Sequence, residues 1–140
     1  MRKPAAPAYR MAQAAGLLGV SVDTVRRWAE AERFPTRLDD GGHRVVDGTA
    51  LAEFAVALAE EEPQLDGVTV VGRSARNRFQ GIVTRVHRGD VAAQVEIQAG
   101  PHRLVSLLTR EAVDELGLVE GMLAIASVKA TNVGVEVVAP

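Results

Sequence analysis

The chain has no cysteine, only two lysines and few aromatic residues, which make up 4% of its 140 positions. The absence of cysteine excludes disulfides, thiolate metal sites and a thiol nucleophile, and it fits a reducing compartment. Apolar runs are short and broken by charges, so none predicts a membrane span, and no apolar signal core follows Met1. We therefore expect a cytoplasmic protein with no membrane partner, folded as one or two small domains.

Charge is distributed unevenly, although the formal net charge is only −2. Residues 1–46 hold eight Lys and Arg against five Asp and Glu, whereas acidic residues concentrate from Asp47 to Asp66. Such local asymmetry matters more for nucleic-acid binding than the total charge does. Almost all cations are arginines, so the lysine at position 129 indicates a specific chemical role there.

Apolar periodicity predicts two short helices near the start of the chain. The first spans residues 11–18 and ends at Gly19, a residue type common just after a helix. Ser21 caps the second, over 22–31, which presents basic residues outward. Trp28 lies on the inner stripe of this helix, so we expect it in the core and not as a base-stacking platform.

A hairpin and a third helix follow. Residues 34–46 place Gly41-Gly42 between two extended segments, which predicts a hairpin wing. Periodic apolar residues predict a helix over 47–61 that Pro63 ends, while residues 1–8 show no periodicity and are predicted to form a flexible arm. A positioning helix, a tight turn, a basic helix and a wing together predict a winged helix-turn-helix.

The first half carries four stretches in a recognisable order: Tyr9–Ala15, Leu18–Ser21, Thr24–Trp28 and Gly41–Arg44. On these residues it resembles the winged helix-turn-helix of the MerR and excisionase type. The resemblance implies that these residues of the second helix and the wing contact DNA: Ser21, Asp23, Thr24, Arg26, Arg27, His43 and Arg44. In an arbitrary helix, simple solvation would be the plainer interpretation of the two helix arginines. Val45-Val46 departs from the family pattern, which often has an aromatic residue or another arginine there.

The second half has the alternation of β-strands. Strands are predicted over 81–87, 91–97, 103–108, 122–128 and 133–138. A short helix capped by Thr109 and ended by Gly117 lies between the third and fourth. Five short strands with one helix predict a small OB-like barrel. The fold class is therefore α+β with two domains, residues 1–61 and 74–140, joined by a linker over 62–73.

Two segments that bracket this barrel suit a small, doubly charged oxyanion. Such an ion loses strong hydration on binding, so hydroxyls, backbone N–H groups and cations must replace the water. The candidate ligands are Ser74, Ala75, Arg76, Thr109, Lys129, Ala130 and Thr131. Lys129 supplies a compact charge, and Arg76 supplies either a second charge or a structural fork. Thr109 also has a full structural role as a helix cap, and Asn77 is as suited to fixing a turn as to binding ligand.

Further stretches give this half a family pattern: Ser74–Asn77, Gly81–Val83, Leu108–Val113 with Glu115–Leu118, Gly121 and Val128–Thr131. On these residues it resembles the TOBE domain of molbindins and molybdate-responsive regulators. The resemblance implies molybdate or tungstate as ligand, with Thr109 of one subunit completing a site built by Ser74, Arg76 and Lys129 of another. It also implies a homo-oligomer, at least a dimer, with tetramer and hexamer left open. The single TOBE copy departs from regulators that carry two in tandem.

Nothing in the sequence indicates catalysis or a metal site. His43, His87 and His102 lack the mutual spacing of metal ligands, and Asp114-Glu115 is a pair of neighbours on a short helix, not a catalytic pair. We expect no enzyme, no metal cation and no organic cofactor.

These patterns predict an oxyanion-responsive transcription regulator that binds an operator in double-stranded DNA. Two alternatives stay open. One is an oxyanion storage or homeostasis protein whose winged helix has lost sequence-specific binding. The other is an architectural DNA-binding protein whose TOBE domain serves only for oligomerisation.

Overall fold

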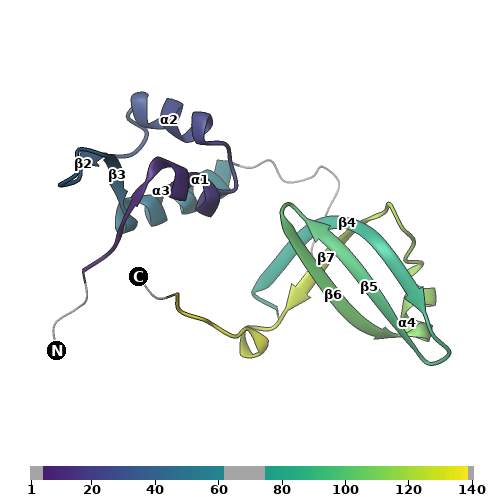
Figure 1. Ribbon diagram of the computed structural model, residues 1–140. Coiled ribbons are helices and arrows are strands. Elements are labelled where there is room, and N and C mark those ends of the chain that lie inside the picture. Colours follow the sequence, from purple (N-terminus) through teal and green to yellow (C-terminus); the bar gives the residue numbers. More distant parts are fainter. Residues whose placement is uncertain (1–4, 62–74, 139–140) are drawn as a thin grey trace. The chain divides into compact units, whose positions relative to one another are not determined.

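The computed structural model describes residues 5–61 and 75–138 (Figure 1). The chain divides into two compact units, Met1–Val68 and Thr69–Pro140, and each is described here by itself. The predicted linker over 62–73 and the candidate ligand Ser74 lie outside the described residues. No helix within the described residues is long and apolar enough to cross a membrane.

The N-terminal unit contains the predicted helices and wing. Helix α1 (Met11–Leu18) ends at Gly19, whose φ of 70° is the left-handed conformation that glycine adopts without strain. Helix α2 (Val22–Glu30) begins at Ser21, whose hydroxyl accepts a hydrogen bond from the Thr24 N–H at 3.2 Å. Strands β2 (Arg37–Leu38) and β3 (Arg44–Asp47) form the wing, and α3 (Gly48–Glu61) follows it directly.

One element was not predicted. Residues 8–10 form strand β1 (Ala8–Arg10), which pairs antiparallel with β3, so the sheet order is β1-β3-β2. The prediction of a flexible arm over 1–8 is therefore wrong at its end. Three residues are too few to show alternation, and the strand exists because Tyr9 lies opposite Val46, 37 positions later.

The core of this unit is closed by aromatic residues. Phe54 of α3 packs edge-on against Trp28 of α2, with 5.3 Å between ring centroids, and at 4.9 Å against Phe34. Trp28 is half-buried on this cluster, which confirms its assignment to the core. The remaining buried residues of the cluster are Met11, Ala14, Ala15, Val25, Ala29, Val46 and Leu51.

The C-terminal unit is a curled four-stranded antiparallel sheet with one helix (Figure 1). Its strands are β4 (Asn77–Arg88), β5 (Ala92–Ala99), β6 (His102–Thr109) and β7 (Leu123–Val128), in the order β6-β5-β4-β7. Helix α4 (Arg110–Leu116) packs on the inner face, where Val113 is fully buried against Val83, Val95 and Ile97. The α+β class with an OB-like half-barrel is confirmed.

Strand β4 changes partners at its middle. Its first half, residues 77–82, pairs with β7, and its second half, from Ile82 onward, pairs with β5. At the change, the two backbones approach so closely that a Cβ on Gly81 would lie 2.4 Å from the Gln98 carbonyl oxygen. Only glycine fits there. This exchange explains why β4 begins four residues before its predicted start.

The prediction of a fifth strand over 133–138 is wrong, because these residues form no strand in the structure. After β7 the chain makes a 3₁₀ turn, η1 (Ala130–Asn132), and residues 133–138 then run without regular structure. The valine alternation that predicted a strand is present, but a strand needs a neighbouring backbone to pair with. None of the described strands lies beside these residues.

Candidate DNA-contacting and anion-binding surfaces

Helix α2 presents its predicted DNA-contacting residues at one exposed surface. Arg26 and Arg27 are exposed, and Arg27 Nη2 donates to Thr24 Oγ1 at 3.4 Å. Arg26 lies 4.0 Å from the Asp23 carboxylate, and both side chains are well exposed. An ion pair so exposed is weak. Both guanidinium groups are therefore available to phosphate oxygens or base edges.

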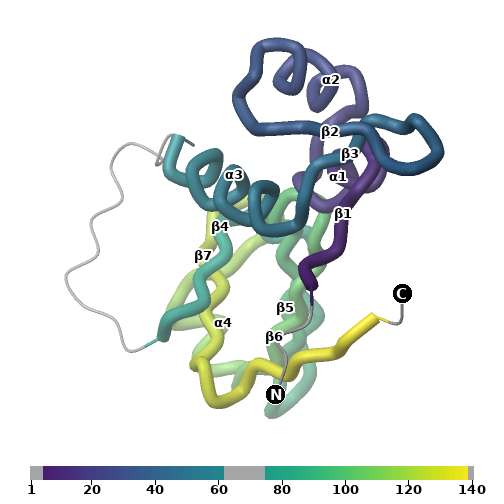
Figure 2. Tube along the Cα trace, turned by 90° about the vertical axis from the view of Figure 1, so that its left-hand side faces the viewer, coloured from purple at the N-terminus to yellow at the C-terminus, as the bar shows by residue number. Residues whose placement is uncertain are grey.

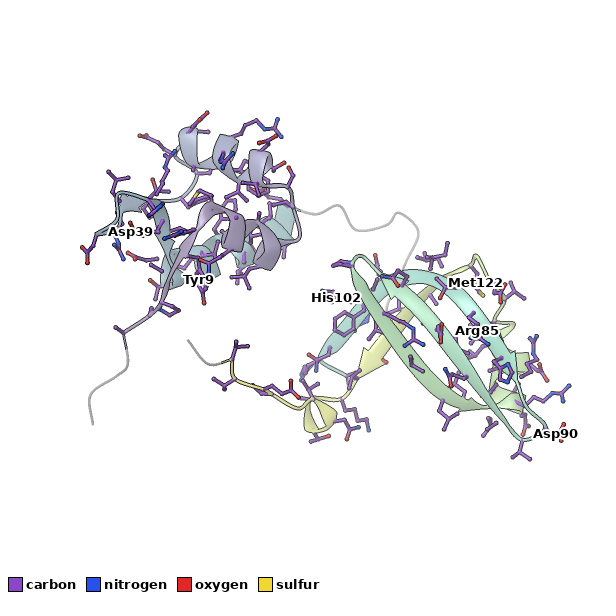
Figure 3. All side chains as sticks on the ribbon, in the orientation of Figure 1. Tyr9, Asp39, Arg85, Asp90, His102 and Met122 are labelled. Carbon is purple, nitrogen blue, oxygen red and sulfur yellow. The ribbon has the colours of Figure 1, made fainter. Side chains whose placement is uncertain are left out.

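The wing turn is organised by Asp39, which Figure 3 labels. Its Oδ1 accepts hydrogen bonds from the backbone N–H groups of His43 at 2.8 Å and Gly41 at 3.0 Å. The His43 N–H bond is the main reason that the pKa of Asp39 lies below its ordinary value of 3.8. His43 Nδ1 also lies 3.4 Å from the same oxygen. Asp39 was not predicted from the sequence, although Asp39-Asp40-Gly41-Gly42 consists of residue types that favour turns.

Arg44 links the wing to the recognition helix. Its Nε donates to Thr36 Oγ1 at 3.0 Å, and its Nη2 donates to the Ala29 carbonyl at 3.2 Å. A cation at the carbonyl end of α2 is favourable because the helix dipole is negative there. Arg44 thus holds wing and helix in a fixed relation, and its predicted contact with DNA stays a prediction.

Arg33 makes a second clamp that the sequence did not reveal. Its guanidinium lies 5.3 Å from the ring centroids of both Trp28 and Phe54. It also donates to both carboxylate oxygens of Glu61, each at 3.0 Å. Because Glu61 is the last residue of α3, this ion pair fastens the end of that helix to the aromatic core.

The described parts of the two candidate anion-binding segments lie together. Asn77 is paired with Val128 across the β4–β7 ladder, and its Nδ2 donates to the Val128 carbonyl at 3.1 Å. Ala75 and Arg76 directly precede this clasp, and Lys129–Thr131 directly follow it. Arg76, Lys129, Ala130 and Thr131 are exposed, so their polar groups are accessible. The side chain of Asn77 therefore joins strands β4 and β7, and it does not fix a turn.

Thr109 lies at the other end of the sheet. It is the last residue of β6, opposite Ala92 at the start of β5, whereas Asn77 and Val128 lie beyond the β5–β6 hairpin. Asp90 and His102, labelled in Figure 3, mark these two ends. Thr109 caps α4, since its Oγ1 accepts from the Ala112 N–H at 3.1 Å. One chain therefore does not bring Thr109 to Lys129.

Among residues 5–61 and 75–138, no group of three or more His, Cys, Asp or Glu side chains is placed to hold a metal ion. Asp114 lies near Arg88 and Arg110, at 3.4 and 4.0 Å, and so has a structural ion-pair role.

Family comparisons match both units. A model of the helix-turn-helix domain matches residues 8–55, and a model of the TOBE domain matches residues 73–135. Both kinds of domain are binding domains. Together they cover nearly all of the described chain.

Known proteins resemble the C-terminal unit. Molybdenum-pterin-binding protein 2 of Clostridium pasteurianum is 39% identical over 61 residues, which are 43% of this chain and 90% of that protein. Molybdenum-pterin-binding protein 1 of the same organism is 36% identical over 61 residues, which are again 43% of this chain and 90% of that protein. A solved molybdate-binding protein from Sporomusa ovata aligns over 47% of this chain and 98% of its own, with 32% identity and a TM-score of 0.46.

Proposed function

This chain belongs to the TOBE-domain family, and we propose that it is a transcription regulator that responds to molybdate or tungstate. Residues 1–61 bind operator DNA, residues 74–140 bind the oxyanion, and residues 62–73 link the two. The observation that carries the proposal is that one chain combines two features. Its helix-turn-helix exposes arginines, and its TOBE sheet has cationic residues beside the Asn77–Val128 hydrogen bond. Such a protein acts where the operator is, which is the cytoplasm of a bacterial cell.

The oxyanion lies beside the Asn77–Val128 clasp. Lys129 neutralises part of its charge, and the hydroxyl of Thr131 donates to an oxygen. Backbone N–H groups at Ala75, Arg76 and Ala130 complete the local donor set, together with Ser74 just before them. Support for this placement comes from the register that fixes both segments at one end of the sheet. The ligand is the oxyanion itself, without a metal cation, an organic cofactor or a catalytic role.

Thr109 reaches this site from a second subunit. It lies at the far end of its own sheet, so a site that contains both Thr109 and Lys129 must span two copies. The protein is therefore at least a dimer, and tetramers or hexamers satisfy the same requirement.

Ligand sharing explains how binding is transmitted to DNA. An oxyanion that bridges two subunits binds the assembled form better, and this difference in affinity is what shifts the equilibrium. Recognition helices of a dimer reach successive half-sites only when they lie about 34 Å apart. A change in assembly, or in the spacing of the two helix-turn-helix units, therefore changes the affinity for the operator.

Calorimetric titration with molybdate and tungstate, with sulfate as the control ion, tests the proposal. Lys129→Ala is expected to weaken oxyanion binding by about 10- to 100-fold, the value of a lost charged hydrogen bond. Arg85→Ala, which removes one positive charge from the same sheet away from the clasp, serves as the matched control. DNA binding should persist in both variants. Equal loss in both, or no loss in either, contradicts the assigned site.

Complementation tests the sharing of the site. Thr109→Asp keeps a residue that caps helices but places a carboxylate against the anion, while Thr109→Asn keeps the cap without charge. A co-assembled mixture of Lys129→Ala and Thr109→Asp chains regains intact sites that neither variant has alone. If the mixture binds no more oxyanion than its two components, the site lies within one subunit.

A storage protein is the second candidate, because the molybdenum-pterin-binding relatives match only the C-terminal unit and nearly their whole length. Selection of bound sequences from a random DNA pool separates the two functions. A regulator enriches one motif, whereas a storage protein with a residual helix-turn-helix shows salt-dependent binding without a preferred sequence.

A further inference from the structure

Helix α2 ends in a turn that glycine normally makes. The helix is followed by Ala31 and then by Glu32, which has a φ of 56°. Among residues 5–61 and 75–138, Glu32 is the only residue other than glycine with a positive φ. This left-handed conformation crowds the Cβ of an L-residue against its own backbone, which is why helices commonly end on glycine there. Glu32 therefore needs support from elsewhere in the fold to hold the turn.

Two backbone hydrogen bonds close the turn. The Glu32 N–H donates to the Ala29 carbonyl at 3.0 Å, and the Arg33 N–H donates to the Trp28 carbonyl at 3.0 Å. This pair of bonds is a Schellman motif, which satisfies carbonyl groups that the end of a helix leaves free. An apolar contact from the residue after the turn back to the helix often accompanies the motif. Here the Arg33 guanidinium makes that contact, 5.3 Å from the Trp28 ring centroid.

The support for this turn comes from α3. The strands of the wing separate α2 from α3 along the chain (Figure 2), so the contact joins distant parts of the sequence. Arg33 Nη2 donates to both carboxylate oxygens of Glu61 at 3.0 Å, and the Arg33 side chain is 34% exposed. A planar guanidinium that contacts both a carboxylate and an aromatic ring is held in one orientation. Because Arg33 directly follows Glu32, the ion pair stabilises the left-handed turn.

The ion pair joins two parts of the chain that matter for DNA binding. At one end, the Ala31 N–H donates to the Arg27 carbonyl at 2.9 Å, so the turn begins at the backbone of a predicted DNA-contacting residue. At the other end, Glu61 is the last described residue of the N-terminal unit. It lies beyond the matched helix-turn-helix segment, which ends at residue 55. The pair therefore connects the recognition helix to the place where the chain continues toward the C-terminal unit.

We propose that Glu61 and Arg33 are positioning residues for DNA recognition. Their ion pair holds Glu32 in the left-handed turn, and this turn fixes the end of the helix that carries Arg26 and Arg27. Without the pair Glu32 relaxes, the last turn of α2 opens locally, and the two exposed arginines lose their fixed place. A change in the course of the chain after Glu61 acts on the recognition helix by the same route. The inference rests on the DNA-binding part of the proposed function, and not on oxyanion binding.

Glu61→Gln in the full-length chain tests the ion pair, because it keeps the shape of the side chain and removes its charge. The probe is a DNA duplex enriched from a random pool, and fluorescence anisotropy measures the affinity. We expect the affinity to fall about two- to five-fold, the range of an exposed ion pair. Removal of a negative charge by itself favours binding to phosphates, so a fall reports lost positioning. Glu60→Gln removes the same charge at the exposed neighbour and should not lower the affinity.

Substitution of Glu32 separates support of the turn from a general effect on folding. Glu32→Gly removes the cost of the left-handed backbone, whereas Glu32→Gln removes the same charge and keeps that cost. We expect Glu61→Gln to weaken DNA binding in the Glu32→Gln chain but not in the Glu32→Gly chain. An equal loss in both chains would overturn the proposal, because the ion pair would then not act through the turn.

Amide hydrogen exchange makes the same comparison without DNA. Exchange of the Arg33 N–H, which closes the turn, should become about two- to five-fold faster in Glu61→Gln and stay unchanged in Glu60→Gln. Equal exchange rates in the wild type and Glu61→Gln would overturn the proposal. If no DNA sequence is enriched from the pool, the proposed regulator is wrong, while the exchange rates still decide whether the ion pair supports the turn.

Discussion

The two units differ in how much of their apolar surface and strand backbone a single chain covers. Of 14 large apolar residues that are exposed in the described chain, 11 belong to the C-terminal unit, and only Leu17, Leu38 and Val56 belong to the N-terminal one. Among the described residues, the N-terminal unit has an aromatic core and two arginine clamps, whereas strands β6 and β7 of the C-terminal sheet each leave one edge unpaired. A single copy thus covers most of the apolar surface of the helix-turn-helix unit, whereas it leaves more of the apolar surface of the TOBE unit exposed.

Phe54→Ala gives the largest expected effect, because it removes the residue on which both Trp28 and Phe34 pack. We expect a loss of about 3–5 kcal/mol in the free energy of unfolding of the N-terminal unit. Trp28 is the only tryptophan, so its fluorescence reports this unit alone. DNA binding should disappear while calorimetric oxyanion binding remains. Loss of both would show that the units are not independent.

Dilution should separate the units without any mutation. A tenfold dilution of a dimer lowers its apparent stability by about 1.4 kcal/mol. We expect the unfolding of the β-sheet, followed by far-ultraviolet circular dichroism, to shift with protein concentration, while the Trp28 fluorescence transition does not. Equal shifts of the two signals would mean that the head also needs its partner.

Substitution of Arg33 tests how much its ion pair and aromatic contacts contribute to the stability of the N-terminal unit. Arg33→Ala removes the contacts with Trp28, Phe54 and Glu61, and we expect the Trp28 fluorescence transition to lose about 1 kcal/mol, since the Glu61 side chain is 59% exposed. Arg33→Lys keeps the charge but not the planar guanidinium, so its unfolding free energy should lie between those of the wild type and Arg33→Ala. An unchanged transition in Arg33→Ala would make the clamp irrelevant to stability.

The smallest expected effect is in the wing. Asp39→Ala frees the Gly41 and His43 N–H groups, so we expect DNA affinity to fall a few-fold while the free energy of unfolding changes little. Asp40→Ala, its exposed neighbour, is the control for charge. Because the pKa of Asp39 is lowered in the folded chain, its stabilisation is present above pH 3.8 and is lost as the pH falls through that lowered pKa. Amide hydrogen exchange at Gly41, measured against pH, checks this direction: protection of the Gly41 N–H should fall as Asp39 is protonated.

Features set by neighbours in sequence were predictable, and features set across the chain were not. Gly19, Ser21, Thr109 and Gly117 act within one helical turn, and each ends or begins a helix as predicted. Strands 91–97, 103–108 and 122–128 were placed within two residues, because alternation on a half-buried sheet is a local signal.

The missed features join distant residues. Strand β1 depends on β3, and the Arg33–Glu61 clamp spans 28 positions. Residues 133–138 show the opposite error, since their alternating valines predicted a strand that has no partner among the described strands. For the candidate site, the two bracketing segments were predicted from their chemistry, but the Asn77–Val128 clasp that aligns them spans 51 positions and could not be read from sequence.

Among the described residues, β6 pairs only with β5 and β7 only with β4, so each of these strands leaves one backbone edge unpaired. Neither strand carries a lysine or a proline, the residues with which sheets commonly discourage unwanted pairing. An unprotected edge is a template for any extended peptide, so these two strands are the part of the described fold most prone to aggregation in a single copy.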